Sequence, residues 1–581
     1  MTTQDFDVLV IGGGATGGGV ALDLALRGLR VALIERADLA DGASGRYHGL
    51  LHSGGRYAVH DPESARECIA ENRILRKIVP HAIEDTGGLF VTTPDDDPAY
   101  ADQWVAACRA CDIETEEISV DQMLRDEPAL NPRITRAFRV PDAASDSFDV
   151  LTALGAAVQA LGGSVLTYHE VVGLTVAGGA VVGATVRNKR TGAERHLAAA
   201  MIVNAAGAWA GQIAAMAGCA ITVRPSKGTM VAMAYRFVNT IINRCHLPGD
   251  GDILVPVGTV AVIGTTSVNV PDPNDTSITA WEVRKMLEEG EKMAPGFSQV
   301  RALRAWAGVR PLYEEGGQAG GREAKRTFAV LDHATRDGVV GLITVVGGKL
   351  TTYRLMAEKA ADVACAQLGV TAACVTREFR ISDFGCFDCA QHRFRIGQHA
   401  TSATDLPIRN LQSAIRNHTL GRRLEELESA PAQDGLICEC ELITRGQIEQ
   451  AAREHPDAVA AWVLDDLRRD LRLGMGPCQG GFCGYRAAAI LNETAGLDAG
   501  QATRALADFA QRRWKGQRPL LWGQGLRQAL LDEQIYRGVL GLDRLAVIND
   551  LPWTALRRFL PRLGLEMASS GTFARLIAQV I

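Results

Sequence analysis

Residues 6–35 read FDVLVIGGGATGGGVALDLALRGLRVALIE. Phe6–Ile11 predict a short buried strand, and Gly12–Gly17 form a G-x-G-x-x-G turn that is followed by apolar residues at helical spacing. Arg30–Ile34 predict a second strand, which ends at Glu35. The order of strand, glycine turn, helix, strand and acid predicts a βαβ unit that binds a dinucleotide.

Each glycine of this turn has a physical role in such a unit. Gly12 permits the tight turn, Gly14 lets the backbone approach a pyrophosphate, and Gly17 lets helix and strand pack closely. The free N–H groups at the start of the helix favour phosphate. Glu35 follows Gly17 by 18 residues and is placed to accept hydrogen bonds from ribose hydroxyls. The alternative is a glycine-rich turn without a ligand. The glycine pattern alone is weak evidence, because the chain holds 61 glycines.

Length and composition limit the class of protein. With 581 residues the chain is too long for one core and predicts about three or four domains. Its 47% hydrophobic and 22% charged residues are ordinary for a soluble globular protein. A net charge of −6, with no long basic run, argues against a nucleic-acid partner. We find no secretion signal and no run of about 18 apolar residues, so we expect no membrane span.

Two further strand–glycine junctions follow later in the chain. MIVNAAG, which ends in Asn204-Ala205-Ala206-Gly207, precedes a predicted helix. GLITVVGGK ends in Gly347-Gly348-Lys349 and is also followed by a helix. Between the two junctions, residues 222–345 predict mainly strands, with one helix near 278–293. Three such junctions fit the long FAD molecule better than NAD.

Other stretches predict elements or functional loops. Residues 36–60 form a polar loop on what we expect to be a rigid scaffold, where function is often found. Residues 62–80 predict an amphipathic helix between two prolines. SVLTYHEVVGLTV, residues 164–176, predicts one strand. The loop contains the polar or aromatic residues Ser44, Arg46, His48, His52, Arg56 and Tyr57.

Four cysteines near the C-terminus form two close pairs. Cys438-x-Cys440 and Cys478-x4-Cys483 each lie by a predicted turn at the start of a helix, where thiolates are favoured. Four thiolates suit a [2Fe–2S] cluster or a tetrahedral zinc ion. The C-x-C spacing fits zinc less well, so the sequence favours the cluster, with zinc or unligated thiols as alternatives.

The remaining cysteines predict no second metal site. Cys386-x2-Cys389 is followed by histidines but lacks a second cysteine pair, so we interpret both as ordinary cysteines. Cys68, Cys108 and Cys219 lie in apolar surroundings and are predicted to be core residues.

Several segments together resemble one family, the large flavin subunit of anaerobic glycerol-3-phosphate dehydrogenase. They are IGGGATGGGVALDLALRGLRVALIER, SGRYHGLLHSGGRYAVHDPESARECIAEN, WAGVRPL, VGGKLTTYRLMAE, RRWKGQRP and the paired-cysteine module. The resemblance covers nearly the whole chain and is weaker at 375–430 and after about residue 545.

The resemblance implies a fold class and a division into domains. The class is α/β, with an FAD-binding Rossmann-type fold like that of D-amino-acid oxidase and glutathione reductase. The resemblance also implies a mixed-sheet substrate domain and a small helical C-terminal domain. The C-terminal domain is expected to resemble bacterioferritin-associated ferredoxin and is called BFD-like. We expect an FAD-dependent oxidoreductase part at 1–370 and an irregular linker at 371–432. The BFD-like [2Fe–2S] domain is expected at 433–490 and a helical extension at 491–581.

The resemblance also implies a reaction and partners. FAD would oxidise sn-glycerol 3-phosphate to dihydroxyacetone phosphate by accepting a hydride. Electrons would pass through the [2Fe–2S] centre to two partners, a second flavin subunit together with a membrane-anchoring iron–sulfur subunit, and then to quinone. The chain would be cytoplasmic and peripheral on the inner face of the cell membrane.

Matching positions supply the expected site residues. His52 is the candidate base, with a hydrogen bond to the flavin as its alternative role, and Lys349 is expected to stabilise the reduced, anionic flavin. The candidate catalytic residues are His52, Arg310 and Lys349. The expected substrate-binding residues are Arg56, Tyr57, Arg310, Arg326 and Lys349. The expected cofactor-binding residues are Gly12, Gly14, Gly17, Glu35, Ser44, His48, Ala206, Gly207, Gly348, Lys349 and Leu350. The expected metal ligands are Cys438, Cys440, Cys478 and Cys483.

Two alternatives share the same layout. An FAD-dependent 2-hydroxyacid dehydrogenase, of the 2-hydroxyglutarate type, would also need arginine and lysine to bind a dicarboxylate. An electron-transfer or scaffold protein without a substrate site would keep both cofactors. The cations at 56, 310 and 349 argue against the scaffold.

Overall fold

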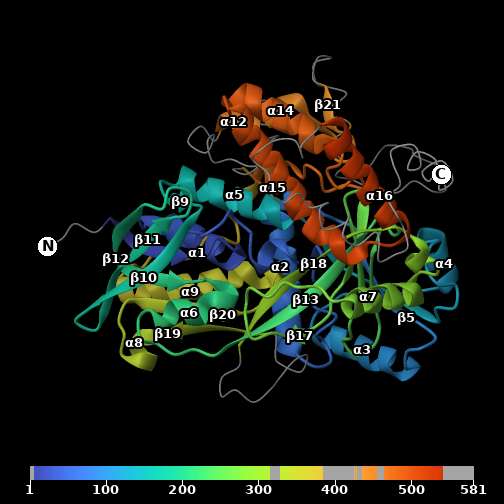
Figure 1. The fold of residues 1–581 in the computed structure, drawn as a ribbon. Helices are drawn as coiled ribbons and strands as arrows, with labels where there is room; N and C mark the ends of the chain where they lie inside the picture. Colours follow the sequence, from blue (N-terminus) through green and yellow to red (C-terminus); the bar gives the residue numbers. More distant parts are fainter. Residues whose placement is uncertain are drawn as a thin grey trace, which may run out of the picture. The chain divides into compact units, whose positions relative to one another are not determined.

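The computed structural model describes residues 5–313, 327–383, 424, 427, 435–454 and 464–540. The chain divides into two compact units, Met1–Ser429 and Ala430–Ile581. Figure 1 shows mixed helices and strands in the first unit and mainly helices in the second. Among the described helices, none combines the length and the apolar content that a membrane crossing requires.

The predicted βαβ unit is present at the N-terminus. β1 (Phe6–Ile11) and β2 (Val31–Ile34) pair in parallel, and α1 (Ala15–Leu26) connects them. The helix ends at Arg27, and Gly28 follows with a left-handed φ of +86° that glycine adopts without strain. The strand bounds agree with the sequence prediction to within one residue.

β1 lies inside the first sheet. The strand order is β9–β2–β1–β12–β20–β19, and all neighbours are parallel except β19, which is antiparallel to β20. β12 also continues into an antiparallel ribbon with β11 and β10. The remaining strands of this sheet are β9 (Ser164–Leu166), β10 (His169–Ala177), β11 (Ala180–Asn188), β12 (Glu194–Asn204), β19 (Phe328–Asp332) and β20 (Leu342–Gly347).

The prediction of one strand at residues 164–176 is wrong, because the structure has two strands there. β9 pairs with β2, whereas β10 pairs with β11. The chain changes partner at Tyr168, whose φ of +58° is incompatible with a continuous strand.

Both faces of the first sheet are covered. Val8 and Val10 of β1 are fully buried against α1, α5 and α9, while Leu9 and Ile11 pack on the opposite face with residues of β12 and α6. This pattern is typical of a parallel sheet between two layers. Besides α1, the described α-helices of the first unit are α2 (Pro62–Ile78), α3 (Pro98–Ala110), α4 (Val120–Asp126), α5 (Ser147–Ala160), α6 (Ala210–Ala215), α7 (Ala280–Met293), α8 (His333–Asp337) and α9 (Tyr353–Leu368).

A second, mixed sheet is built mainly from the middle of the chain. Its order is β17–β13–β16–β15–β14–β5–β7–β6, and β18 pairs along the length of β13. The predicted strand-rich segment and its helix, now α7, are confirmed. The strands are β5 (Gly88–Thr92), β6 (Glu116–Ile118), β7 (Arg136–Val140), β13 (Val223–Met233), β14 (Ile241–Arg244), β15 (Ile253–Val257), β16 (Val260–Gly264), β17 (Val268–Asn269) and β18 (Ala302–Tyr313). A small third sheet contains β3 (Leu50–Leu51), β4 (Ile83–Glu84) and β8 (Ala143–Ser145).

The second unit is a helical assembly with one short hairpin. Its elements include β21 (Leu436–Cys438), β22 (Ile443–Thr444), α12 (Arg445–Glu454), α13 (Leu464–Leu471), α14 (Cys483–Ala495), α15 (Ala499–Gln517), α16 (Gly523–Glu533) and the π-helix η10 (Gln534–Val539). α14 packs against α12 and α15. Most of the predicted linker, including Cys386 and Cys389, lies outside the described residues, as does the tail after residue 540.

Candidate functional site

Gly12 and Gly17 are required by close contacts of the backbone. Gly12 has a φ of +112°, and a Cβ there would lie 2.5 Å from the carbonyl oxygen of Ala205. A Cβ on Gly17 would lie 1.9 Å from the carbonyl oxygen of Gly12. These contacts fit the tight-turn and packing roles predicted for the two glycines. They also join the β1 junction to the β12 junction.

The start of α1 is held by the polar loop. Gly14, the N-cap residue, offers no capping side chain, and the Ala15 amide donates to Ser44 Oγ at 3.0 Å. Ser44 therefore lies beside the amides at which a pyrophosphate is expected.

Glu35 is fixed next to the turn by two backbone amides. Its Oε2 accepts from the Gly13 amide (2.8 Å) and its Oε1 from the Ala37 amide (2.9 Å). Burial raises the pKa of this carboxyl, and the two amide hydrogen bonds oppose that shift. A carboxylate has further lone pairs, so binding of ribose hydroxyls stays a prediction.

The other two junctions end on the same edge of the sheet. Asn204 donates from Nδ2 to Ala210 O (2.9 Å) and Thr344 Oγ1 (3.1 Å), which ties β12 to β20. Gly348 has a φ of +73°, and a Cβ there would lie 2.3 Å from Met356 Sδ. Carboxyl ends of parallel strands form the usual ligand crevice of open α/β sheets.

One cavity of about 940 Å³ runs along these junctions. Its size suits a large ligand such as FAD, and Gly12, Gly14, Gly347 and Gly348 among its lining residues expose the backbone to such a ligand. Gly17, which packs against Gly12, does not line the cavity, and Arg326 lies outside the described residues. The predicted residues that line the cavity are Gly12, Gly14, Glu35, Ser44, His48, His52, Arg56, Tyr57, Ala206, Gly207, Arg310, Gly348, Lys349 and Leu350.

Two histidines in this cavity are held neutral. Removal from bulk water, followed by the charges of Arg56 and Arg310, lowers the pKa of His48 to about 3. His48 Nδ1 accepts from the Leu50 amide (3.3 Å), so the proton of the neutral ring is on Nε2. Desolvation, then His48, Arg56 and Lys349, hold the pKa of His52 well below its usual value. Burial is the main cause of both shifts, and the nearby cations add to it.

Arg310 is oriented by the pairing of β13 with β18. It lies opposite Ser226 in the register and donates to Ser226 Oγ (3.3 Å) from Nη1. Its Nη2 donates to Thr265 Oγ1 and to Thr266 O (2.9 Å). Gly228 leaves the room for this guanidinium, because a Cβ there would lie 2.2 Å from Nη2.

Arg56 is held by a buried acid that sequence reasoning missed. Its Nη1 lies 2.6 Å from Asp252 Oδ2, and its Nη2 donates to Gly249 O (3.2 Å). Asp252 Oδ2 also accepts from the Gly249 amide (2.7 Å). The Asp252 side chain is 1% exposed, so the pair is protected from solvent. In the sequence, Asp252 is marked only by its place as an acid in the turn before β15.

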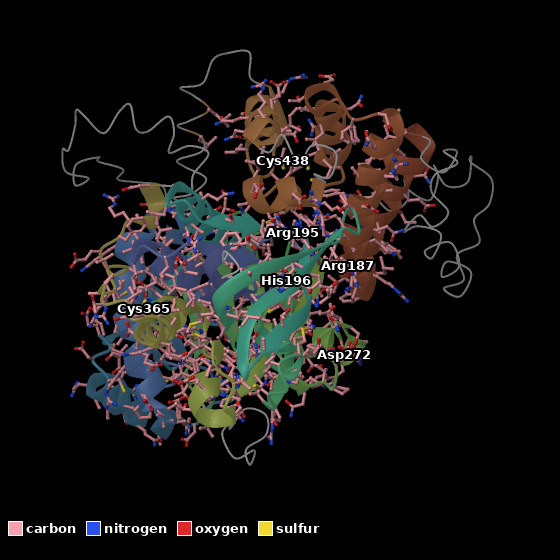
Figure 2. The ribbon with its side chains drawn as sticks, turned by 90° about the vertical axis from the view of Figure 1, so that its left-hand side faces the viewer. Arg187, Arg195, His196, Asp272, Cys365 and Cys438 are labelled. Carbon is pink, nitrogen blue, oxygen red and sulfur yellow. The ribbon has the colours of Figure 1, made fainter. Side chains whose placement is uncertain are left out.

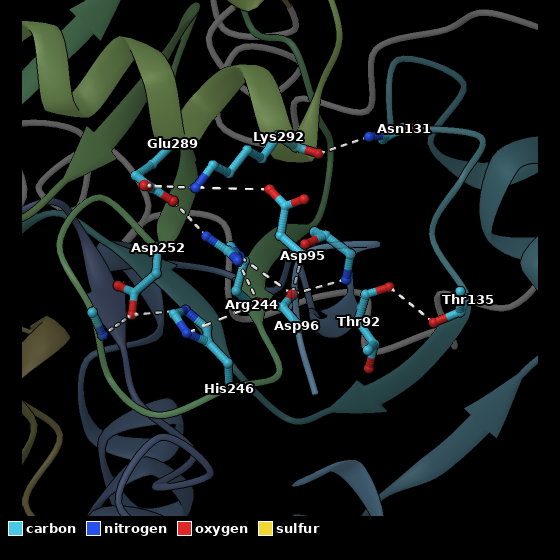
Figure 3. Close-up of polar contacts among 12 residues, drawn as sticks. Thr92, Asp95, Asp96, Asn131, Thr135, Arg244, His246, Asp252, Glu289 and Lys292 are labelled. Atoms are coloured by element: carbon cyan, nitrogen blue, oxygen red, sulfur yellow. Dashed lines mark hydrogen bonds and ion pairs between the residues drawn. The ribbon is translucent and has the colours of Figure 1, made fainter. Parts of the chain in front are cut away.

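Further ion pairs lie behind Asp252 (Figure 3). His246 Nε2 lies 3.6 Å from Asp252 Oδ2, and its Nδ1 lies 4.0 Å from Asp96 Oδ1. Arg244 pairs with both Asp96 and Glu289. Burial lowers the pKa of His246, although Asp252 opposes that shift. This network anchors β14 to α7 beneath the cavity wall.

Aromatic rings connect the remaining cation to the histidines. Lys349 Nζ lies 5.0 Å from the centre of the Tyr57 ring, and that ring lies 5.4 Å from the His52 ring. The arrangement brings Lys349, Tyr57 and His52 together at one place in the cavity. At another place, Arg36 stacks on Trp209 at 4.0 Å, a pair that sequence reasoning also missed.

The four predicted cysteine ligands meet in the second unit (Cys438 is labelled in Figure 2). Hydrogen bonds from the thiols of Cys440 and Cys483 lower the pKa of Cys478, and interaction with Cys438 and Cys478 raises that of Cys483. Backbone amides also point at the sulfurs: those of Gly480 and Phe482 bond to Cys478. Amide hydrogen bonds to sulfur are a characteristic of iron–sulfur sites.

The four thiols contact one another in a chain and not in one tight group. Zn–S bonds of about 2.3 Å place four sulfurs roughly 3.8 Å from one another. In the described part of the chain, the group with three or more ligand atoms all within 4.8 Å is Cys219, His333 and Asp337, and not these cysteines. The contacts run from Cys440 to Cys478, and from there through Cys483 to Cys438. Cys68, Cys108 and Cys219 are buried, which confirms that they are core residues.

Two family models match this chain. The model described as FAD dependent oxidoreductase matches residues 7–354, and the BFD-like [2Fe-2S] binding domain matches residues 436–493. The first match covers more than half of the chain. Both predicted cofactors, FAD and a [2Fe–2S] cluster, are thereby confirmed.

Solved structures show the same fold. Glycerol-3-phosphate dehydrogenase from Bacillus halodurans, complexed with FAD, superposes with a TM-score of 0.60 at 21% identity, covering 89% of this chain and 95% of that one. L-alpha-glycerophosphate oxidase from Mycoplasma pneumoniae, with FAD bound, gives 0.52 at 20% identity, covering 62% and 94%. The predicted FAD-binding fold class is confirmed.

Sequence relatives extend over nearly the whole chain. An anaerobic glycerol-3-phosphate dehydrogenase subunit of Escherichia coli (strain K12) is 43% identical over 93% of this chain and 98% of its own length. The corresponding subunit of Haemophilus influenzae is 41% identical over 95% and 96%. The chain therefore belongs to this family of anaerobic glycerol-3-phosphate dehydrogenase subunits and is an FAD-dependent oxidoreductase with a BFD-like [2Fe–2S] domain.

Proposed function

We propose that this chain oxidises sn-glycerol 3-phosphate to dihydroxyacetone phosphate. The observation that carries the proposal is the presence of Arg56, Arg310 and Lys349 in the cavity that His48 and His52 also line. A phosphate monoester is close to a dianion at neutral pH, and a pocket of positive potential binds it strongly. The relatives that cover the chain are named for the same substrate.

Arginine side chains suit the phosphate. Arg56 and Arg310 have planar guanidinium groups held in place by their own partners, so little conformational freedom is lost on binding. Tyr57 is placed to donate to a substrate oxygen, and Lys349 supplies a point charge beside it. Arg326, outside the described residues, remains a predicted fourth cation.

His52 is the proposed base. The C2–H bond of the substrate breaks, its electron pair leaves as hydride, the hydroxyl proton passes to an imidazole nitrogen of His52, and a C=O bond forms. FAD, when bound, supplies the hydride acceptor. A base must be neutral before it acts, and His52 is neutral because its pKa is depressed. Burial is the main cause of the depressed pKa and the nearby cations add to it, so a bound phosphate, which offsets those cations, makes His52 more basic.

We also propose roles for the cluster and for partner subunits. The four cysteines, Cys438, Cys440, Cys478 and Cys483, hold the cluster, which carries electrons singly from the flavin. The acceptors are a second flavin subunit together with a membrane-anchoring iron–sulfur subunit, which reduce quinone. The chain would then lie on the cytoplasmic face of the membrane, attached through its partners. The word "subunit" in the relatives' names supports such an assembly.

Anaerobic spectroscopy of the purified, cofactor-loaded chain tests the proposal. Glycerol 3-phosphate should bleach the oxidised flavin band, and 2-hydroxyglutarate should leave it unchanged. Bleaching by 2-hydroxyglutarate alone would assign the chain to the 2-hydroxyacid dehydrogenases. A flavin that neither compound reduces, together with no dye-linked turnover, would indicate a scaffold protein and contradict the proposal.

A further inference from the structure

The cysteine loop of the second unit is contacted by helices that follow the cluster domain. The BFD-like family model ends at residue 493. α15, α16 and η10 come after it and contain several fully buried side chains, including Phe509 (1% exposed) and Tyr536 (3% exposed). What these two residues touch indicates why they are buried.

Phe509 packs directly on the backbone of the loop. A Cβ on Gly474 would lie 2.8 Å from Phe509 Cζ, and one on Gly480 would lie 2.6 Å from Phe509 Cε1. Both glycines also have left-handed φ values, +72° and +89°. The ring therefore lies against the loop where any larger residue would collide with it.

Tyr536 and Asp532 contact the next residues of the loop. The Tyr536 hydroxyl donates to Gly480 O at 3.0 Å. A Cβ on Gly484 would lie 2.9 Å from the Tyr536 hydroxyl oxygen, and one on Gly481 would lie 2.5 Å from Asp532 Oδ1. These contacts lie between Cys478 and the first turn of α14, the helix that begins at Cys483.

Arg513 of α15 fixes the same loop through Gln479. Its Nε donates to Gln479 O (3.3 Å), and its Nη2 donates to Gln479 Oε1. The side-chain nitrogen of Gln479, Nε2, in turn donates to Met475 O (3.1 Å) and Gly476 O (3.0 Å). Gln479 thereby connects the residues before Cys478 to α15.

We propose that residues 499–540 are part of the cluster site, with Phe509 excluding water and Tyr536 holding the carbonyl of Gly480, the residue whose amide faces the sulfur. Gly480 is bound at both ends: its amide donates to Cys478, and its carbonyl accepts from Tyr536. Hydrogen bonds to sulfur and solvent exposure are the factors by which a protein sets cluster potential and lifetime. The inference does not depend on the substrate of the flavin unit.

Two variants separate the two roles. Tyr536→Phe keeps the ring but removes the hydroxyl, so the Gly480 amide is held less firmly and stabilises the reduced cluster less. We expect its midpoint potential to fall. Phe509→Ala opens the loop to water, which stabilises the added negative charge, so we expect its potential to rise. Both variants should lose cluster faster in air, by about tenfold, as outer-shell changes commonly do.

The measurements use the whole chain loaded with both cofactors. They are redox titration followed by electron paramagnetic resonance, the decay of cluster absorbance in air, and iron and sulfide content. Flavin content and melting temperature report folding. Leu531→Ala, a change at a side chain of α16 that is 43% exposed, is the matched control and should behave as wild type.

A second variant covers the case in which Phe509→Ala fails to fold. If Phe509→Ala does not fold, Phe509→Leu takes its place, and if both are insoluble, Tyr536→Phe decides alone. Wild-type potential and cluster lifetime in the folded variants would overturn the proposal. A shift in Leu531→Ala equal to that in Tyr536→Phe would overturn it as well.

Discussion

Arg56 and Asp252 form an ion pair of 2.6 Å across 196 residues of sequence. Asp252 is almost completely buried, whereas Arg56 reaches the cavity with 14% of its side chain exposed. The acid holds the guanidinium in a fixed direction before any substrate arrives. It also balances the charge of Arg56 while the cavity holds no phosphate.

Replacing Asp252 by Asn should make folding depend on substrate. Breaking one side of a buried pair leaves an uncompensated charge and costs about 3–5 kcal/mol. A bound phosphate supplies the missing negative charge, so glycerol 3-phosphate should raise the melting temperature of Asp252→Asn more than that of wild type. Glu116→Gln, which removes an exposed acid paired with Arg139, is the control and should melt as wild type. Equal stabilisation of Asp252→Asn and wild type by substrate would contradict the role of Asp252.

Gly228→Ala should damage catalysis without loss of FAD. Its Cβ would lie 2.2 Å from Arg310 Nη2 and must displace the guanidinium. A misplacement of about 1 Å commonly costs roughly 100-fold, and we expect a fall of that order in kcat/KM for glycerol 3-phosphate. Gly173→Ala is the matched control, because a Cβ on Gly173 meets nothing within 4 Å. Steady-state kinetics at equal flavin content decide, and unchanged kcat/KM in Gly228→Ala would refute this view of Arg310.

His48 should make the protein less stable in acid. Its folded-state pKa of about 3 lies below the unfolded value of about 6.5. Between these values the unfolded chain binds a proton that the folded chain does not. The free energy of unfolding therefore falls as the pH drops from about 6.5 toward about 3, by at most about 1.4 kcal/mol per pH unit.

Denaturant titrations at several pH values between these limits measure that slope. His48→Gln should make it shallower. His196→Gln changes an exposed histidine of β12 (Figure 2) and should keep the wild-type slope. An unchanged slope in His48→Gln would mean that His48 is protonated in the folded protein.

Cys478→Ser should separate the two cofactors. Removing one thiolate should abolish the spectrum of the [2Fe–2S] cluster while FAD remains and glycerol 3-phosphate still bleaches it. Cys219→Ser is the control, since Cys219 lies beside His333 and Asp337 in the first unit, where His333 Nε2 already hydrogen-bonds to Thr344 Oγ1 (2.9 Å). Iron content should fall in the first variant and stay unchanged in the second. Equal iron loss in both variants would indicate that the metal is bound in the first unit.

Local chemistry explains why much of the fold could be predicted from sequence. The βαβ unit depends on residues that are neighbours along the chain, and the collisions at Gly12 and Gly17 are within that unit or with the adjacent β12 junction. Arg310 and Lys349 could be found because each lies within a short motif, and both line the cavity. Asp252 could not be found, because nothing near it in sequence indicates Arg56 as its partner.

The contacts of the C-terminal helices with the cysteine loop could not be predicted for a similar reason. The family resemblance led us to expect a helical extension at 491–581, and α15 and α16 lie within that range. An expected helix does not say which surface its apolar side chains cover. The contact of Phe509 with Gly474 joins segments 35 residues apart, and only packing in space reveals it. Tyr168 shows the same limit within one predicted strand, because the change of partner there depends on β2 and β11.

The pairing of Ser226 with Arg310 has a consequence for how this protein can vary. Side chains alternate between the two faces of a sheet, so inserting or deleting a single residue in β13 or β18 would turn the guanidinium to the opposite face. The two strands must therefore keep their residue count around this pair, unless a bulge such as the one between Ala232 and Met233 absorbs the change. Natural variants should therefore differ here by substitution and almost never by length.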